Sequence, residues 1–249
     1  MFEDQTITGI IPARYASTRF PGKPLALLRN KPMVQWVYEG CKDSFDHIAV
    51  ATDDHRIADA VKQFGGHCIM TSPDHRTGTE RCLEAVQQLD QQKGIRSDIV
   101  VNIQGDEPFI RQEQIRELLG CFVNETVQIG TLCRPLSSDE DPADPNIVKT
   151  ITDHAGRALC FSRAPIPYFR NIEHPEPRHY LKHIGLYAFR ANTLEEICKL
   201  PPSPLEQAES LEQLRWMEHG FEIHTRPTGF VSMGVDTPED LEKIKDRIR

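Results

Sequence analysis

The stretch Ile10–Leu25, with the sequence IIPARYASTRFPGKPL, says most about how this chain folds. It continues an apolar run, Thr6–Ile11, that is typical of the first strand of an α/β sheet, and Pro32 opens a helix after it. The part of this stretch that follows the strand, residues 12–25, contains two arginines, a lysine, two aliphatic hydroxyl side chains and a glycine. Loops at the carboxyl ends of such strands bind ligands, and cations together with backbone N–H groups suit phosphates. The stretch therefore predicts a phosphate-binding loop.

A solvated basic loop without a ligand is the alternative interpretation of this stretch. Prolines at positions 12, 21 and 24 fix the backbone at three points, which favours an ordered loop over a flexible loop without a ligand. The spacing of its glycine and lysine does not match a Walker A motif. We therefore expect a triphosphate site of a different kind.

The composition of the 249 residues fits a soluble globular protein, with 39% hydrophobic and 27% charged residues. A formal net charge of −8 argues against a general nucleic-acid binder, which needs a basic face. No apolar run approaches the roughly 20 residues of a membrane span, and Met1–Gln5 lacks the features of a signal peptide. The seven cysteines form no C-x-x-C pair, which is typical of a reducing cytoplasm. We expect a cytoplasmic protein that binds neither membranes nor nucleic acids.

The first half of the chain alternates between strand-like and helical patterns. The predicted strands are Thr6–Ile11, His47–Thr52, His67–Met70, Ile99–Gln104 and Gln128–Cys133. The predicted helices are Met33–Lys42, His55–Phe64, Thr79–Gln92 and Gln112–Val123. This alternation implies right-handed crossovers and a mostly parallel sheet flanked by helices.

The alternation ends after Cys133. The segments Val148–Thr152 and Ala158–Phe161 are typical of a short hairpin, and His183–Phe189 of a further strand. Ser210–Gln213 has the form of a capping box. No linker is long enough to separate two domains. We therefore expect an α/β fold in a single domain of residues 1–249, with a core half of about 1–133, a small β-rich extension of about 134–235, and a C-terminal helix that returns to the core.

Two aspartates stand at strand ends, where a metal site is expected in a nucleotide-binding α/β domain. Asp106 follows a buried strand in the sequence QGDEP, and Asp236 precedes a helix in GVDTPED. Mg²⁺ prefers carboxylate and phosphate oxygens, so the two could form a magnesium site. The alternatives are a polar turn at Asp106 and a helix-capping acid at Asp236, worth only about 0.3–1 kcal/mol through the helix dipole.

Three side chains of the second half could bind a carboxylated polyol. Arg163 could bind the carboxylate, and His183 and Tyr187 the hydroxyls. Strand alternation places His183 and Tyr187 on the same face. A buried structural His–Tyr pair is the alternative. The segment Asp74–Arg81 leads into a helix whose first N–H groups could contact a base or a phosphate, although an ordinary capped helix has the same pattern.

Taken together, the motifs resemble one enzyme family along nearly the whole chain. The loop at 10–25 is followed in order by QGDEP, SRAPIPY, HIGLYAF, SPLEQAESLEQLR and GVDTPEDLE. This set resembles the 3-deoxy-manno-octulosonate (Kdo) cytidylyltransferases. The resemblance implies a nucleotidyltransferase fold, CTP and Kdo as substrates, Mg²⁺ and a homodimer. It also implies transfer of CMP to Kdo with release of pyrophosphate, for lipopolysaccharide synthesis in a Gram-negative-type bacterium, with sugar binding and dimerisation in the extension at 134–235.

The resemblance also implies roles for individual residues. The implied catalytic residues are Arg14, Lys23, Asp106 and Asp236, the two aspartates as magnesium ligands. The implied CTP contacts are Pro12, Ala13, Arg14, Ser17, Lys23, Thr77, Gly78, Arg81 and Gln104. The implied Kdo contacts are Arg19, Gln104, Arg163, His183, Tyr187, Glu212 and Gln213. The chain departs from the family pattern at Arg76-Thr77, near the expected cytosine contacts, and at Phe169, where an acid is common.

Three other functions are weighed against this one. A related cytidylyltransferase would use sialic acid or an amino-substituted Kdo. A dinucleotide-binding oxidoreductase would need a Gly-x-Gly-x-x-Gly motif after the first strand, which is absent. A non-catalytic binding protein of the same fold would release no pyrophosphate from any pair of CTP and sugar.

Overall fold

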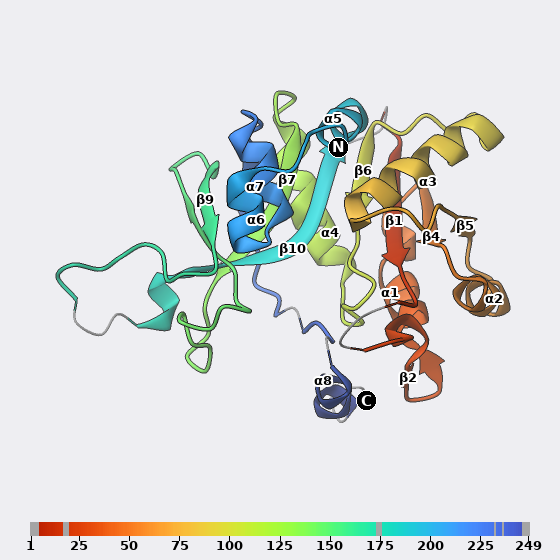
Figure 1. Ribbon diagram of the computed structural model, residues 1–249, viewed down its shortest axis with the longest axis horizontal. Coiled ribbons are helices and arrows are strands. Elements are labelled where there is room, and N and C mark those ends of the chain that lie inside the picture. The colour runs from red at the N-terminus through yellow and green to blue at the C-terminus, as the bar shows by residue number, and fades with distance from the viewer. Residues whose placement is uncertain (1–4, 17–19, 173–175, 232, 236, 246–249) are drawn as a thin grey trace. The chain divides into compact units, whose positions relative to one another are not determined.

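The computed structural model describes residues 5–16, 20–172, 176–231, 233–235 and 237–245 (Figure 1). The chain forms two compact units. The first unit is Met1–Arg116 with Val231–Arg249, and the second is Glu117–Phe230. Predicted site residues Ser17, Arg19 and Asp236 lie outside the described residues.

The first unit is built on a parallel sheet. Its strands are β1 (Ile7–Ala13), β4 (His47–Thr52), β5 (Cys68–Met70) and β6 (Ile99–Asn102). Strand β1 pairs in parallel with β4 on one side and β6 on the other, and β4 pairs in parallel with β5. The four residues of β6 are all buried, as expected for a parallel strand covered on both faces. The predicted parallel α/β core is therefore confirmed.

Helices connect these strands. They are α1 (Met33–Cys41), α2 (His55–Gln63), α3 (Gly78–Lys93) and α8 (Pro238–Lys245), with the short 3-10 helices η1 (Lys23–Leu25) and η2 (Lys42–Ser44) and the two-stranded ribbon β2 (Leu27–Leu28) and β3 (Lys31–Pro32). Helix α3 buries Cys82, Ala85 and Leu89, a spacing that gives one apolar face. Leu241 and Ile244 of α8 pack with Met33 at the start of α1, so the C-terminal helix belongs to this unit.

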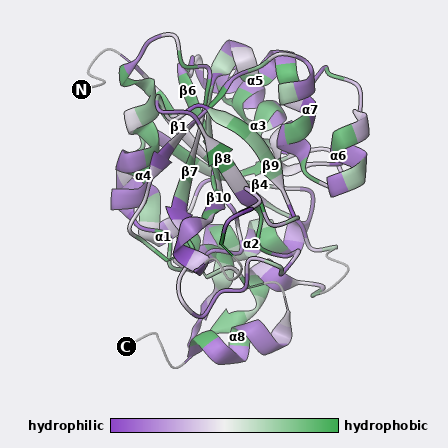
Figure 2. Ribbon diagram, turned by 90° about the vertical axis from the view of Figure 1, so that its left-hand side faces the viewer, coloured by the Kyte–Doolittle hydropathy of each residue, from purple (hydrophilic) through white to green (hydrophobic). Residues whose placement is uncertain are grey.

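The second unit has a mixed sheet. Its strands are β7 (Ile129–Pro135), β8 (Lys149–Thr152), β9 (Ala158–Ser162), β10 (Leu181–Arg190) and β11 (Ile223–Pro227). Strand β7 pairs antiparallel with β10 and parallel with β11, and the predicted hairpin is confirmed as β8 and β9. Its helices are η3 (Gly120–Val123), η4 (Pro177–His179), α5 (Ala191–Ile197), α6 (Pro204–Glu209) and α7 (Glu212–Glu218), and α4 (Gln112–Leu119) connects the two units. Hydrophilic and hydrophobic residues alternate along α4 and α7 (Figure 2), as in helices with one buried face.

Some predicted boundaries are wrong. The capping box is not at Ser210–Gln213, because Ser210 adopts a left-handed conformation that ends α6 and Leu211 caps α7 without a side-chain bond. Instead, the backbone N–H of Ser203 donates to Glu206 at 3.3 Å at the start of α6. The helix predicted to run to Val123 becomes a 3-10 helix after Leu119. Among the described residues, no helix is long and apolar enough to cross a membrane.

Candidate functional site

The phosphate loop predicted after β1 closes on itself at its base. The backbone N–H of Gly22 donates to the carbonyl oxygen of Tyr15 at 2.8 Å. Gly22 has a positive φ of 73°, a conformation that other residues adopt only with strain. Its missing side chain also makes room, since a Cβ there would lie 3.1 Å from the ring of Tyr15. The loop thus returns beside the end of β1 and presents Lys23 at the start of η1.

Lys23 and Asp106 meet in an ion pair. The Lys23 Nζ lies 2.6 Å from Asp106 Oδ2, although the two residues are 83 positions apart in the sequence. Their side chains are only 14% and 28% exposed. The structure therefore brings the predicted phosphate loop and the predicted metal ligand together. It also shows that the Asp106 carboxylate lies where a cation can be bound.

The carboxyl ends of β1 and β6 approach each other closely at this point. A Cβ on Gly105 would lie 3.0 Å from the carbonyl oxygen of Pro12 in β1, so the backbone would have to shift by a few tenths of an ångström to admit it. Ala13, the last residue of β1, is buried at 2% exposure, and Arg14 follows it. Gln104 lies in the same loop as Asp106, and it is partly buried. The close approach of the Pro12 carbonyl oxygen therefore explains why a glycine stands at position 105.

Asp236, the other predicted metal ligand, lies outside the described residues. Its sequence neighbour Val235 is fully buried, and its backbone N–H donates to the carbonyl oxygen of Asp106 at 2.9 Å. The chain next to Asp236 therefore reaches Asp106. Among the residues that the structure describes, no three His, Cys, Asp or Glu side chains form a metal site. The magnesium site stays a prediction.

The start of α3 supplies further candidate CTP contacts. Thr77 caps this helix by accepting the backbone N–H of Glu80 at 3.2 Å, and Gly78 is its first residue. Arg81 is completely buried, and its Nη1 donates to Thr71 Oγ1 at 2.5 Å. Burial lowers the pKa of Arg81, although Asp53, 3.4 Å from its Nη2, acts in the opposite direction.

Sequence reasoning missed two residues near this helix. Asp53 follows β4 and Asn102 ends β6, and each has a buried side-chain oxygen without a hydrogen-bond partner among the described residues. Arg81 likewise has its Nε unpaired. A polar residue at the end of a buried strand or directly after it was the available signal for both. These unpaired groups are the kind that a polar ligand satisfies.

His183 and Tyr187 lie together in the second unit, with ring centroids 5.3 Å apart. The His183 Nε2 is 3.1 Å from Thr131 Oγ1. Burial lowers the pKa of His183 to about 3, so the ring is neutral at pH 7. Burial also raises the pKa of Tyr187, whose hydroxyl has no hydrogen-bond partner among the described groups. The pair can exchange hydrogen bonds with hydroxyl groups but cannot supply a charge at neutral pH.

Arg163, expected from the sequence to bind a sugar carboxylate, directs its guanidinium to backbone carbonyl oxygens. Its Nε donates to the carbonyl oxygen of Glu209 at 2.6 Å, Nη1 to that of Pro145 at 2.7 Å, and Nη2 to that of Ser210 at 3.3 Å. The guanidinium is therefore already engaged with backbone. This engagement comes from residues remote in sequence, which the local pattern could not show.

The two predicted Kdo contacts on α7 differ in exposure. Gln213 is buried at 5% exposure, whereas the Glu212 carboxylate is partly exposed and accepts a hydrogen bond from Arg215 at 2.7 Å. Trp216, which sequence reasoning missed, packs its ring edge-on against Tyr187 with centroids 5.3 Å apart. Trp216 lies three residues after Gln213 on α7, and this helical spacing was the available signal for it.

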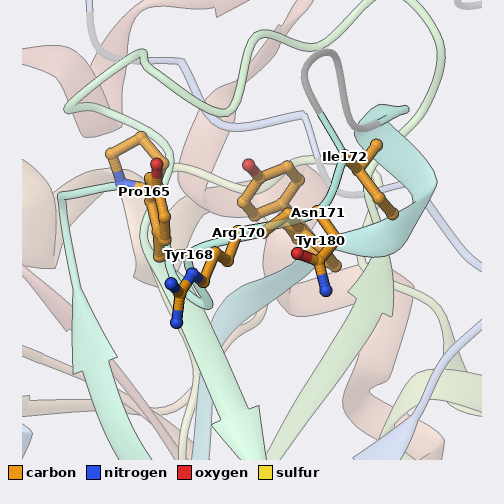
Figure 3. Close-up of a pocket in the computed structure, with 7 residues that line it drawn as sticks. Pro165, Tyr168, Arg170, Asn171, Ile172 and Tyr180 are labelled. Carbon is orange, nitrogen blue, oxygen red and sulfur yellow. The ribbon is translucent and has the colours of Figure 1, made fainter.

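A pocket of about 700 Å³ opens in the second unit after β9 (Figure 3). Its lining residues are Pro165, Tyr168, Phe169, Arg170, Asn171, Ile172 and Tyr180. Phe169, which departs from the family pattern, packs against a small core of Leu136, Ile147 and Tyr180. Tyr168 is 87% exposed. The pocket therefore joins a packed aromatic floor to an exposed aromatic rim.

Comparison with known proteins identifies the family. The family model described as Cytidylyltransferase matches residues 8–223. The chain is 54% identical over 242 residues to the 3-deoxy-manno-octulosonate cytidylyltransferase of Parabacteroides distasonis, covering 94% of this chain and 95% of that protein. It is 48% identical over 247 residues to the enzyme of the same name from Bacteroides thetaiotaomicron, covering 97% of each.

Among solved structures, a CMP:2-keto-3-deoxy-manno-octonic acid synthetase complexed with CTP matches with a TM-score of 0.89 and 43% identity, covering 98% of both chains. A cytidylyltransferase from Leptospira borgpetersenii matches with a TM-score of 0.63 at 18% identity, covering 97% of this chain and 85% of that one, a likeness of fold alone. These matches agree with the α/β architecture. The chain belongs to the cytidylyltransferase family, among the 3-deoxy-manno-octulosonate cytidylyltransferases.

Proposed function

We propose that this protein transfers CMP from CTP to Kdo, forming CMP-Kdo and pyrophosphate. The observation that carries this proposal is the Lys23–Asp106 pair, which joins a cationic loop to a carboxylate at the ends of two parallel strands. Family membership and the relatives' names give the substrates CTP and Kdo. The product would supply activated Kdo for lipopolysaccharide synthesis.

Residues of the first unit would bind the triphosphate. Arg14 and Lys23 carry positive charge beside the end of β1, where they would neutralise the charge that develops on the departing pyrophosphate. The closed base of the loop at Gly22 fixes Lys23 relative to β1, so the charge is already in place before the reaction. Thr77, Gly78 and the buried Arg81 would bind the cytidine part.

Asp106 and Asp236 would hold Mg²⁺. The fit rests on the Asp106 carboxylate, which is partly exposed and already contacts a cation, and on Val235, which ties the chain next to Asp236 to Asp106. When bound, the metal ion would supply charge stabilisation on the phosphate oxygens and lower the pKa of the attacking anomeric hydroxyl. The pKa of His183 is lowered to about 3 by burial, so this ring would be a weak base and would serve as a hydrogen-bonding group.

Residues of the second unit would bind the sugar. The Tyr187 hydroxyl and the neutral His183 ring are suited to hydroxyl groups, because each can exchange hydrogen bonds without bringing a charge. Glu212 and Gln213 would add contacts from the start of α7. Because these polar side chains would hydrogen-bond the hydroxyl groups of Kdo, an analogue that lacks one of these hydroxyls would be used less efficiently.

We also propose a homodimer and a cytoplasmic site of action. The exposed Tyr168 and Ile172, with 87% and 43% exposure, lie on the rim of the pocket of Figure 3 and offer an apolar surface for a second copy. The seven cysteines are all free, which suits a reducing compartment. Light scattering of the purified protein, with Tyr168→Ser as the variant, tests the dimer.

The reaction is tested by pyrophosphate release from CTP and Mg²⁺ with a panel of acidic sugars. We expect turnover with Kdo and much less with sialic acid, while an amino-substituted Kdo is the close competitor. Asp106→Asn and Asp236→Asn should each lower kcat by orders of magnitude at limiting Mg²⁺, because each removes a negative ligand. No pyrophosphate with any sugar would indicate a binding protein, and a fluorescence change on titration with NADH would favour the oxidoreductase.

A further inference from the structure

Lys149 is a completely buried cation that the proposed mechanism does not use. It is the first residue of β8 and has 0% of its surface exposed. Its Nζ donates to the carbonyl oxygens of Asp144 at 3.0 Å and Ile147 at 2.6 Å, and to that of Arg163. An ammonium group has three N–H donors, and all three are therefore satisfied by backbone.

Arg163 extends this network to the corner between α6 and α7. Its guanidinium donates to the carbonyl oxygens of Glu209 and Ser210, the last residue of α6 and the one after it. The Glu209 carboxylate in turn accepts the Ser162 hydroxyl at 2.6 Å and the backbone N–H of Arg163 at 2.8 Å. The contacts thus run from β8 through Arg163 to the helix corner, and back to the end of β9.

Burial makes the positive charge of Lys149 energetically unfavourable. Burial lowers its pKa, and the nearby Asp144 and Glu209 carboxylates oppose that effect without pairing directly with the ammonium. Removing the ammonium would leave three backbone carbonyl oxygens without this hydrogen-bond donor. The ammonium group therefore fixes the loop 144–147 to the backbone at Arg163, directly after β9.

We propose that Lys149 is a positioning residue for the sugar site, which acts through Arg163 and the α6–α7 corner. The corner is followed at once by Glu212 and Gln213, at the start of α7. The inference rests on the proposed function, in which these two residues contact Kdo. Arg163 is likewise a positioning residue, because its guanidinium donates to the carbonyl oxygens of Glu209 and Ser210 at this corner.

The test is Lys149→Met, which keeps a long apolar side chain and removes the three hydrogen bonds. We expect the KM for Kdo to rise about tenfold or more while the KM for CTP stays within about twofold. The carbonyl oxygens left without a donor would make the α6–α7 corner less ordered, and this corner precedes the proposed Kdo contacts and no proposed CTP contact. Lys182→Met is the matched control. Lys182 lies directly opposite Lys149 on β10, but it donates to Glu140 and is 22% exposed. This control should leave both KM values within about twofold.

A second variant covers the case in which Lys149→Met does not fold. Glu209→Gln keeps the shape of the network and removes its carboxylate, and the KM for Kdo should rise at least threefold. A folded Lys149→Met protein with wild-type KM for both substrates overturns the proposal, as does equal loss of CTP and Kdo affinity.

Amide hydrogen exchange separates this inference from the proposed function. In Lys149→Met, the N–H groups of 209–213 should exchange faster than in the wild type, whatever sugar the enzyme uses. If the wild type releases no pyrophosphate with Kdo but this exchange difference is found, the proposed substrate fails and the network stands. Unchanged exchange in this segment overturns the network itself.

Discussion

Glu140 is expected to contribute pH-dependent stability to the second unit. Its Oε1 accepts hydrogen bonds from Arg134 at 2.7 Å and Lys182 at 2.8 Å, and its Oε2 accepts the backbone N–H of Ser137 at 2.8 Å. Burial alone would raise the pKa of this carboxyl, but the hydrogen bonds lower it from 4.5 to about 2. Glu140→Gln removes the charge and leaves Arg134, whose side chain is 6% exposed, without its carboxylate partner.

The size of the effect follows from the shift in pKa. A lowering from 4.5 to about 2 corresponds to about 3.4 kcal/mol of unfolding free energy at pH 7, at 1.36 kcal/mol per pKa unit. Because the folded pKa is the lower one, this stabilisation is complete above the unfolded pKa and is lost as the pH falls through the folded pKa. At pH 3.5 the same linkage leaves about 2.0 kcal/mol. The carboxyl side chain keeps 16% exposure, so solvent screening makes these upper values.

The assay is urea denaturation of wild type and Glu140→Gln, followed by far-UV circular dichroism between pH 7 and pH 3.5. We expect a difference in unfolding free energy of about 2–3 kcal/mol at pH 7 that shrinks as the solution is acidified. Glu222→Gln is the control, since Glu222 is 57% exposed and its pair with Arg157 is screened by solvent and should contribute little. A difference that is independent of pH, or no larger than the control, would refute the reasoning.

Three further predictions concern other parts of the molecule. Gly105→Ala should lower the unfolding free energy by about 1–3 kcal/mol and raise the KM for CTP, because the new Cβ meets the Pro12 carbonyl oxygen at 3.0 Å; a melting curve unchanged from wild type contradicts this. Lys23→Ala should raise the KM for CTP far more than the KM for Kdo in steady-state kinetics. A rise confined to the KM for Kdo would mean that this loop does not bind the triphosphate. The Cys41 thiol should not react with Ellman's reagent at pH 8 until the protein unfolds, because burial raises its pKa to about 12; rapid labelling of Cys41 in the folded protein, located by mass spectrometry, is the contrary result.

Local patterns in the sequence were sufficient where the structure depends on near neighbours. The strand His47–Thr52 was predicted with the bounds that it has, and the helices Met33–Lys42 and His55–Phe64 each end within one residue of the prediction. Apolar periodicity determines these elements, because each buries one face or one short run against the sheet. The same patterns predicted the hairpin β8–β9.

The sequence alone failed where a contact joins remote segments. Ser210 and Gln213 have the residue types of a capping box, but Ser210 ends α6 in a left-handed conformation and the cap is not formed. The sequence around Arg163 predicted an arginine that binds a sugar carboxylate. In the structure its side chain donates to the carbonyl oxygens of residues 145, 209 and 210. Neither outcome is encoded within a few residues of the position concerned.

What the sequence by itself determined is the α/β class, the position of the strands and the identity of the polar residues at their ends. The alternation of apolar runs and helical patterns is a local property, and loops at the carboxyl ends of parallel strands necessarily gather at one edge of the sheet. Only the tertiary structure decided that Lys23 pairs with Asp106 across 83 positions and that His183 is neutral. Ion pairing and desolvation depend on distance and burial in space, and these arise only when the chain is folded.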